Sequence, residues 1–210
     1  MSPLPRRMVD RWRNRQELGP GQGRLYWHIL LRDQPEVRNV AQTAQARLAR
    51  FPGLHMTPAR WLHITVLVAG TADEITDDQQ RDMLAAASKL LAKISPSIVG
   101  IGNVLYHREA IALSVHPTEF LDQLREAVQI ATLEATGTEY RTEEPTQWFP
   151  HVTIAYSETE QPAEPLIAAL GRQLPSCETS INAVSLVIQR GAERLWDWHP
   201  VGDALLYGHR

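Results

Sequence analysis

The chain has 210 residues, of which 43% are hydrophobic, and its formal net charge at pH 7 is −3, so it can bury a core in one domain or in two small fused lobes. An acidic chain is a poor candidate for a sequence-independent binder of long nucleic acid, because the affinity of such proteins comes mostly from neutralising phosphates. The single cysteine, Cys177, excludes an internal disulfide. The sequence has no apolar run of membrane-span length and no signal-peptide region, so we expect a cytoplasmic protein with no membrane partner.

The N-terminal residues are basic. Residues 1–32 contain seven arginines against two acidic residues, a net charge of +5, which leaves −8 for the rest of the chain. We expect residues 1–23 to form an arm that packs on the body through Met8 and Trp12, ahead of a single domain over residues 24–210. Arginines in such an arm are also suited to local contacts with phosphates.

Hydrophobic periodicity then predicts alternating strands and helices. The expected strands cover residues 24–31, 61–68, 97–105, 110–116, 148–156, 181–189 and 194–201. The expected helices cover residues 36–50, 76–93, 117–135 and 163–174. The order strand, helix, strand, helix, two strands occurs about twice. This favours an α+β, bilobal fold in which two pseudo-symmetric lobes of sheet and helices face a central cleft.

Two copies of the motif His-x-Thr stand in the expected strands at 61–68 and 148–156, one in each half of the chain. They are His63-Ile64-Thr65 and His151-Val152-Thr153. Side chains alternate along a strand, so the His and Thr of each motif share a face. The same alternation sets Leu62, Ile64, Val66 and Val68 on the opposite face of the first strand, and Pro150, Val152, Ile154 and Tyr156 on that of the second. One copy alone would more often be an incidental half-buried strand, whereas two copies favour a functional site.

Two histidines and two threonines in one small volume suit the chemistry of a phosphodiester. Near neutral pH one imidazole can accept a proton while the other donates one. The hydroxyls of Thr65 and Thr153 can donate hydrogen bonds to the phosphate oxygens as negative charge builds. Residue types do not decide which histidine is the base; we favour His151 as base and His63 as acid. Strand histidines also occur in zinc sites, but hydroxyl partners two residues on suit an anion better, so we expect neither metal nor cofactor.

Four segments carry a resemblance to a known family. They are Arg24–Leu31, Ala59–Val66, Trp148–Ser157 and Leu195–Trp198. Together with the two motifs they resemble the 2H phosphoesterase superfamily, which is defined by two His-x-Thr/Ser motifs and includes bacterial 2′-5′ RNA ligase-like proteins and cyclic phosphodiesterases. The resemblance covers about residues 22–207. It implies the same bilobal architecture about a pseudo-two-fold axis, and 2′-5′ ligase activity as the reverse reaction.

Further side chains are candidates for substrate binding. Trp61 and Phe149 each stand two residues before a motif histidine, where an aromatic ring either stacks on a nucleobase or forms the cleft wall. Tyr156 ends the second motif strand, where its hydroxyl could reach a phosphate. His28 lies on a strand expected beside the first motif. Arg60 and Arg190 are candidate anion contacts, each against a plain surface role.

The sequence thus predicts a metal-independent phosphodiesterase for 2′,3′-cyclic phosphates or 2′-5′ bonds in nucleotides or short RNA, acting as a monomer. Within this class the alternative is degradation of a cyclic nucleotide signal. From another class, the alternative is a non-catalytic module that binds nucleotides or RNA ends. Intact His and Thr in both motifs favour an enzyme, because a binding module needs no matched proton donor and acceptor.

Overall fold

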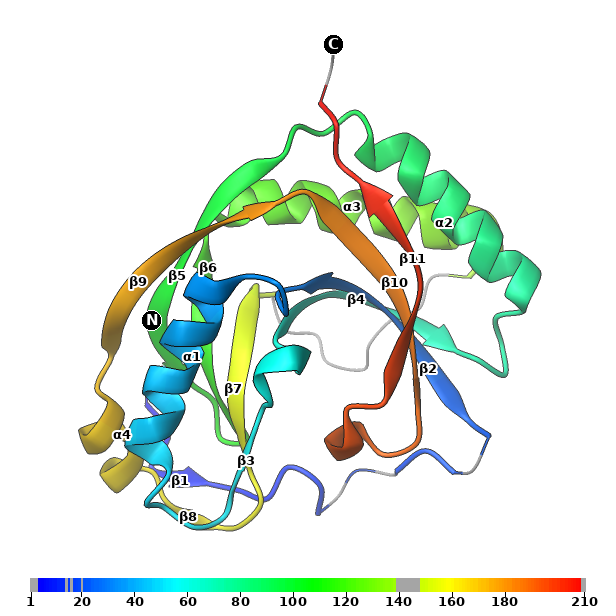
Figure 1. Cartoon of the computed structure of the whole chain (residues 1–210). Coiled ribbons are helices and arrows are strands. Elements are labelled where there is room, and N and C mark those ends of the chain that lie inside the picture. Colours follow the sequence, from blue (N-terminus) through cyan, green and yellow to red (C-terminus); the bar gives the residue numbers. More distant parts are fainter. Residues whose placement is uncertain (1–3, 14, 16, 20, 139–147, 209–210) are drawn as a thin grey trace.

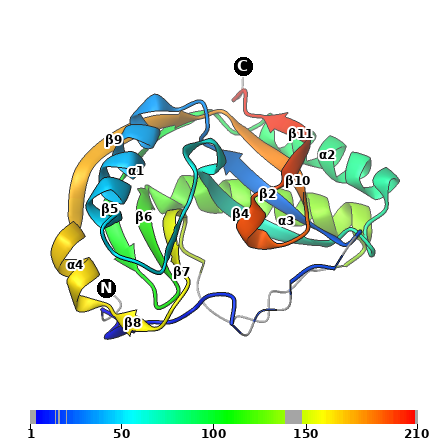
Figure 2. The same cartoon turned by 60° about the horizontal axis from the view of Figure 1, so that its bottom comes forward.

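A computed structural model describes residues 4–13, 15, 17–19, 21–138 and 148–208 (Figures 1 and 2). The strands are β1 (Arg7–Met8), β2 (Gly23–Leu30), β3 (Leu54–Met56), β4 (His63–Thr71), β5 (Ser97–Tyr106), β6 (Ala110–His116), β7 (His151–Ser157), β8 (Gln161–Pro162), β9 (Gln173–Ile181), β10 (Ala183–Arg190) and β11 (Trp198–Leu205). The α-helices are α1 (Pro35–Leu48), α2 (Asp77–Leu91), α3 (Thr118–Thr136) and α4 (Glu164–Leu170). Short 3₁₀ turns at Ala59–Trp61 and Glu193–Leu195 come before β4 and β11. The predicted α+β class is confirmed.

One curved sheet carries the order β11-β10-β2-β4-β7-β6-β5-β9, and β3 pairs with β7 beside this path. The sheets of the two expected lobes are therefore joined, at β4 and β7. Helices α2 and α3 pack on each other and on the half with β11 and β4, whereas α1 packs with α4 and covers β7 and β9 (Figure 1). One half of the sheet consists of β11, β10, β2 and β4, and the other of β7, β6, β5 and β9. Helix α1 follows β2 in the first half but covers the second, and α3 follows β6 in the second half but packs on β4 in the first.

The helices follow their sequence signals closely. On α1 the buried side chains recur three and four residues apart, as a helix face requires: Val37, Val40, Ala41, Ala44 and Leu48. A capping box opens α2, since the Thr76 side chain accepts from the Gln79 N–H and the Gln79 side chain accepts from the Thr76 N–H. Among the described residues, no helix is long and apolar enough to cross a membrane.

Residues 163–181 differ from expectation. The predicted helix 163–174 ends at Leu170, because Gly171 adopts a positive φ of 75° that terminates it. The next residues form β9, which lies at one end of the sheet and pairs with β5. An edge position tolerates Pro175 and exposed polar side chains, so this strand lacks the alternation by which a strand is recognised. The short strands β1, β3 and β8 were also not expected.

The N-terminal arm is held to the body by backbone and side-chain contacts. Strand β1 pairs with β8, and the Arg11 N–H donates to the Ser157 carbonyl at 2.9 Å. Met8 is fully buried, and the Trp12 ring packs edge-on against Tyr156 with 5.7 Å between ring centroids. The arm therefore reaches the end of β7, the strand that carries the second motif.

Candidate active site

The two motifs lie side by side at the centre of the sheet. Strands β4 and β7 run antiparallel and pair through Ile64 and Val152, which are the middle residues of the two motifs. An antiparallel pair of this kind has a local two-fold axis between its members. The two His-x-Thr segments are therefore related by an approximate two-fold rotation, as expected for a site built from two similar halves.

Each motif is followed at once by a β-bulge. His28 lies opposite Thr65 while Trp27 lies opposite Leu67, so Val66 has no partner on β2. Strand β7 repeats this against β6, because Thr153 and Ala155 have partners there and Ile154 has none. A bulge inserts one residue and so reverses the alternation of side chains beyond it.

This reversal corrects two expectations. Val68 lies opposite Tyr26, and Tyr156 lies opposite Ala110. Residues opposite one another in antiparallel strands share a face. The expectation that Val68 and Tyr156 face away from the motif histidines is therefore wrong. Tyr156 belongs to the face of His151 and Thr153.

Both motif histidines are held by the same backbone contact. The Nδ1 atom of His63 lies 2.7 Å from the Trp61 carbonyl oxygen, and Nδ1 of His151 lies 2.8 Å from the Phe149 carbonyl oxygen. A carbonyl oxygen can only accept, so each Nδ1 carries a proton and donates it. The remaining nitrogen, Nε2, is left in each ring to give or take a proton in a reaction.

The surroundings keep both imidazoles neutral at pH 7. The pKa of His63 is lowered to about 4. Burial is the largest cause, and the charge of His151 adds to it. The hydrogen bond to the Trp61 carbonyl and the charge of Glu193 act in the opposite direction. Burial also lowers the pKa of His151; the carbonyl contact opposes this, and the Arg11 guanidinium adds to it. A bound phosphate would act in the opposite direction, because an anion stabilises the charged imidazolium.

Tryptophans wall the site on the His63 side. The Trp198 ring stands edge-on to His63 at 4.6 Å and to Trp61 at 4.9 Å between centroids. Trp196 lies between the motifs, with its ring centroid 6.3 Å from that of His63 and 5.7 Å from that of Tyr156. Trp196 has a positive φ of 55°, which is rare for a bulky residue and incompatible with a continuous strand. The predicted strand 194–201 accordingly begins only at Trp198.

Four predicted substrate-binding residues lie at the motifs. Trp61 is half-buried in the wall just described, and Phe149 is 57% exposed beside His151. Tyr156 is buried; burial raises the pKa of its hydroxyl, although Arg11 opposes this, so the hydroxyl stays protonated and can donate. His28 contacts Thr65 of the first motif from the neighbouring strand β2, and only 2% of its surface is exposed.

The two predicted arginines differ in position. Arg60 is exposed, and its guanidinium carbon lies 5.3 Å from the centroid of the Trp61 ring, at the rim of the aromatic wall. Arg190 is exposed at the end of β10, where it lies opposite Gly23. His28 stands near the other end of β2, so the strands do not bring Arg190 to the motifs.

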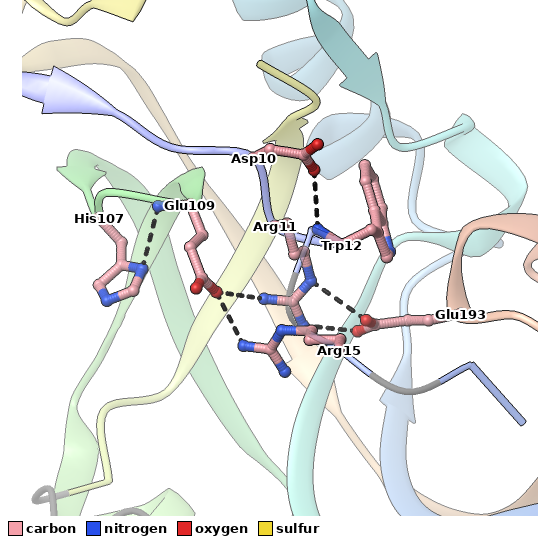
Figure 3. A network of polar contacts seen from close by, with 7 residues as sticks. All are labelled: Asp10, Arg11, Trp12, Arg15, His107, Glu109 and Glu193. Carbon is pink, nitrogen blue, oxygen red and sulfur yellow. Dashed lines mark hydrogen bonds and ion pairs between the residues drawn. The ribbon is translucent and has the colours of Figure 1, made fainter. Parts of the chain in front are cut away.

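A network of charges from three segments reaches the site, and sequence reasoning did not anticipate it (Figure 3). Arg11 donates from Nε and Nη2 to the two carboxylate oxygens of Glu193, at 3.1 and 2.6 Å, and from Nη1 to Glu109 at 3.3 Å. Arg15 donates to the same Glu109 at 2.7 Å. The Arg11 guanidinium carbon also lies 4.2 Å from the Tyr156 ring centroid. The arm thus links the β5–β6 turn to the β10–β11 loop beside the second motif.

Ser114 is a further polar residue at the site that sequence reasoning missed. It lies opposite His151 on β6, is 5% exposed, and its hydroxyl has no hydrogen-bond partner among the described residues. A serine between apolar residues in a strand carries no recognisable functional signal, so only the register with β7 reveals it. Across the residues that the structure describes, no three His, Cys, Asp or Glu side chains gather in a way that could hold a metal ion.

Comparison with known proteins identifies the family. Residues 33–193, which include both motifs, match the model of the 2′-5′ RNA ligase superfamily. The chain belongs to that superfamily. The match confirms the predicted resemblance and the predicted class, an enzyme of the two-histidine phosphoesterase type. No curated protein sequence matches the chain significantly.

Solved structures share the fold over almost their whole length. The protein TT0787 of Thermus thermophilus is 21% identical, with a TM-score of 0.68 over 89% of this chain and 100% of that one. E. coli LigT complexed with 3′-AMP is 14% identical, with a TM-score of 0.64 over 91% of this chain and 99% of that one. The MHV ns2 PDE domain is 16% identical, with a TM-score of 0.56 over 80% of this chain and 99% of that one. At these identities the likeness shows the fold.

Proposed function

We propose that the protein is a metal-independent phosphodiesterase that opens 2′,3′-cyclic phosphates or 2′-5′ phosphodiester bonds in nucleotides or short RNA, and that it catalyses 2′-5′ ligation in the reverse direction. The observation that carries this proposal is the pairing of Ile64 with Val152. It brings together two imidazoles, each with Nε2 left for proton transfer, and two hydroxyls at the same positions relative to them. Such a set matches the needs of a phosphodiester, which requires one proton acceptor, one proton donor and support for its anionic oxygens.

In the hydrolytic direction His151 is the base and His63 the acid. His151 Nε2 takes a proton from water, the water oxygen bonds to phosphorus, and the bond from phosphorus to the leaving ribose oxygen breaks. His63, which carries a second proton on Nε2 once the bound phosphate has raised its pKa, gives that proton to the leaving oxygen. Nearby charges support this division of roles, because Glu193 favours a charged His63 and Arg11 favours a neutral His151. Thr65 and Thr153 donate to the non-bridging oxygens.

Nucleotides are the favoured substrate class for two reasons. E. coli LigT, which shares the fold, has been crystallised with 3′-AMP, with ATP and with NADP+. In this chain, a cavity of about 550 Å³ opens where the arm meets the β5–β6 turn, and four arginines line it: Arg11, Arg13, Arg15 and Arg108. These side chains are suited to the next phosphate of a short RNA, although they share the cavity with three acidic residues.

Two alternatives make different predictions. A phosphodiesterase for a cyclic nucleotide signal would use the same histidines but would prefer a 3′,5′-cyclic ring. A non-catalytic module would bind nucleotides or RNA ends without turnover. The matched Nδ1 contacts of both histidines favour catalysis, because they fix the tautomer of each ring, which a binding module does not require.

A substrate screen in EDTA tests the proposal. The wild-type protein is incubated with 2′,3′-cyclic mononucleotides, 2′-5′ dinucleotides, 3′,5′-cyclic nucleotides and ADP-ribose cyclic phosphate, and the position of the product phosphate is determined. We expect turnover of the first or second class. Turnover of 3′,5′-cyclic nucleotides alone would support the signalling alternative, and binding without turnover of any compound would support the non-catalytic one.

A further inference from the structure

A third histidine lies beside the first motif, on the same face of the sheet. His28 on β2 lies opposite Thr65, and its Nε2 is 3.3 Å from the Thr65 hydroxyl oxygen. Its ring also stacks on that of His63, with 4.3 Å between centroids and 29° between the planes. Only 2% of His28 is exposed, so it contacts both functional residues of the motif without facing the substrate.

The imidazole of His28 does not favour the stability of the fold. The Nδ1 atom of His28 is buried and has no hydrogen-bond partner in the part of the chain that the structure describes, and an unpaired buried polar atom costs stability. A purely apolar ring of the same shape would avoid that cost. The corresponding position beside the second motif is Ala112, opposite Thr153, so the pairing of a motif strand with its neighbour does not by itself call for an imidazole.

The contact between His28 and Thr65 can have either polarity, and the surroundings favour one. If Nδ1 carried the proton, a buried N–H would be left unpaired. The Thr65 hydroxyl would then donate its hydrogen bond to Nε2 and could not donate it to a substrate. If Nε2 carries it, only an unpaired lone pair remains at Nδ1, and buried unpaired acceptors are tolerated better than unpaired donors. The Nε2–H then donates to the Thr65 oxygen and leaves the hydroxyl proton available.

We propose that His28 is a positioning residue of the first motif, whose Nε2–H holds the Thr65 hydroxyl so that its proton points to the substrate phosphate. The inference rests on the proposed function, since it requires Thr65 to donate to a phosphate oxygen. The stack on His63 gives the same residue a second effect: it limits the rotation of the ring that the Trp61 carbonyl already holds. His28 acts through these two side chains and not on the substrate.

The test uses the full chain and a 2′,3′-cyclic nucleotide. His28→Phe keeps the ring and its stacking but removes both nitrogens, whereas His28→Gln keeps a donor near the position of Nε2. We expect His28→Phe to lower kcat about 10-fold or more with little change in KM, because one transition-state donor loses its orientation. We expect the Tm of this variant to be equal to or higher than that of the wild type, since the unpaired nitrogen is gone. His28→Gln should recover part of the lost kcat.

A double variant separates positioning from a general effect. If His28 acts through Thr65, then His28→Phe combined with Thr65→Val should be no slower than Thr65→Val alone. His199→Phe is the control: it also replaces an imidazole with a phenyl ring, and His199 is exposed on the edge strand β11, opposite Ile188 and at the end of the sheet away from β4 and β7. Its kcat should stay near the wild-type value.

The outcomes distinguish this inference from the proposed function. An active wild type with an equally active His28→Phe variant overturns the inference alone. Full additivity of the two substitutions, or a drop in kcat that follows a drop in Tm and is not rescued by Gln, also overturns it. A wild type without turnover of any 2′,3′-cyclic or 2′-5′ substrate overturns the proposed function, and the inference with it.

Discussion

The pKa of His63 predicts an unusual loss of stability in mild acid. In the folded protein this pKa is about 4, against 6.5 for an ordinary histidine. Between these values the unfolded chain binds a proton that the folded protein does not, so the free energy of unfolding falls as the pH drops. The contribution of His63 is fully present above about pH 6.5 and is lost progressively down to about pH 4. Linkage over these two values gives a loss of about 3 kcal/mol between pH 7 and pH 4, as an upper bound for a half-buried ring.

The assay compares the wild type with His63→Gln, which cannot gain a charge. Urea unfolding is followed at pH 7, 5.5 and 4, and the six tryptophans of the chain report the transition. The difference between the two pH profiles reports the contribution of the His63 imidazole, including its electrostatic coupling to His28 and His151. We expect the wild type to lose more than the variant over this range, by at most about 3 kcal/mol. Parallel profiles would show that the imidazole is well solvated and would refute the argument.

Three further sets of substitutions test the site. His63→Ala and His151→Ala should each lower kcat at least 100-fold in a turnover assay, because each removes one proton transfer worth about 10² to 10⁴; near-normal turnover of either would contradict the two-histidine mechanism. Thr65→Val and Thr153→Val should lower kcat by about 10 to 10³-fold while the proton path remains, and unchanged rates in both would mean that the hydroxyls do not face the phosphate. Arg11→Leu should lower the free energy of unfolding by about 2 kcal/mol and speed limited proteolysis of the arm, because it removes a cation that pairs with two carboxylates; an unchanged proteolysis rate would mean that the arm is held without this residue.

Local signals in the sequence predicted the elements that depend on local physics. The stripe on α1 and the capping box at Thr76 are short-range patterns, and both helices form close to the expected residues. The two motifs were recognisable because each lies in a strand with an apolar opposite face. Repetition of the motif, more than either copy alone, predicted that the two strands meet.

Features set by long-range pairing could not be read from the sequence. Val66 and Ile154 look like ordinary strand residues, and only their missing partners on β2 and β6 reveal the bulges that turn Tyr156 toward the motifs. Likewise Arg11 and Glu193 stand 182 residues apart, and nothing in the sequence near either one points to the other. Such contacts arise from tertiary structure, and periodicity and turn signals carry no information about them because they are local.

The pH dependence of the rate, with and without chelator, tests the central claim most directly. The wild type is assayed on a 2′,3′-cyclic nucleotide from about pH 4 to pH 9, with and without EDTA. Since burial lowers the pKa of both His63 and His151, kcat/KM should follow a bell with its optimum below about pH 6.5, and kcat should have a higher optimum because the bound phosphate raises these pKa values. Neither profile should change with EDTA. A rate that only rises with pH and collapses in EDTA would instead show that the histidines act as metal ligands, and it would contradict the paired acid-base mechanism.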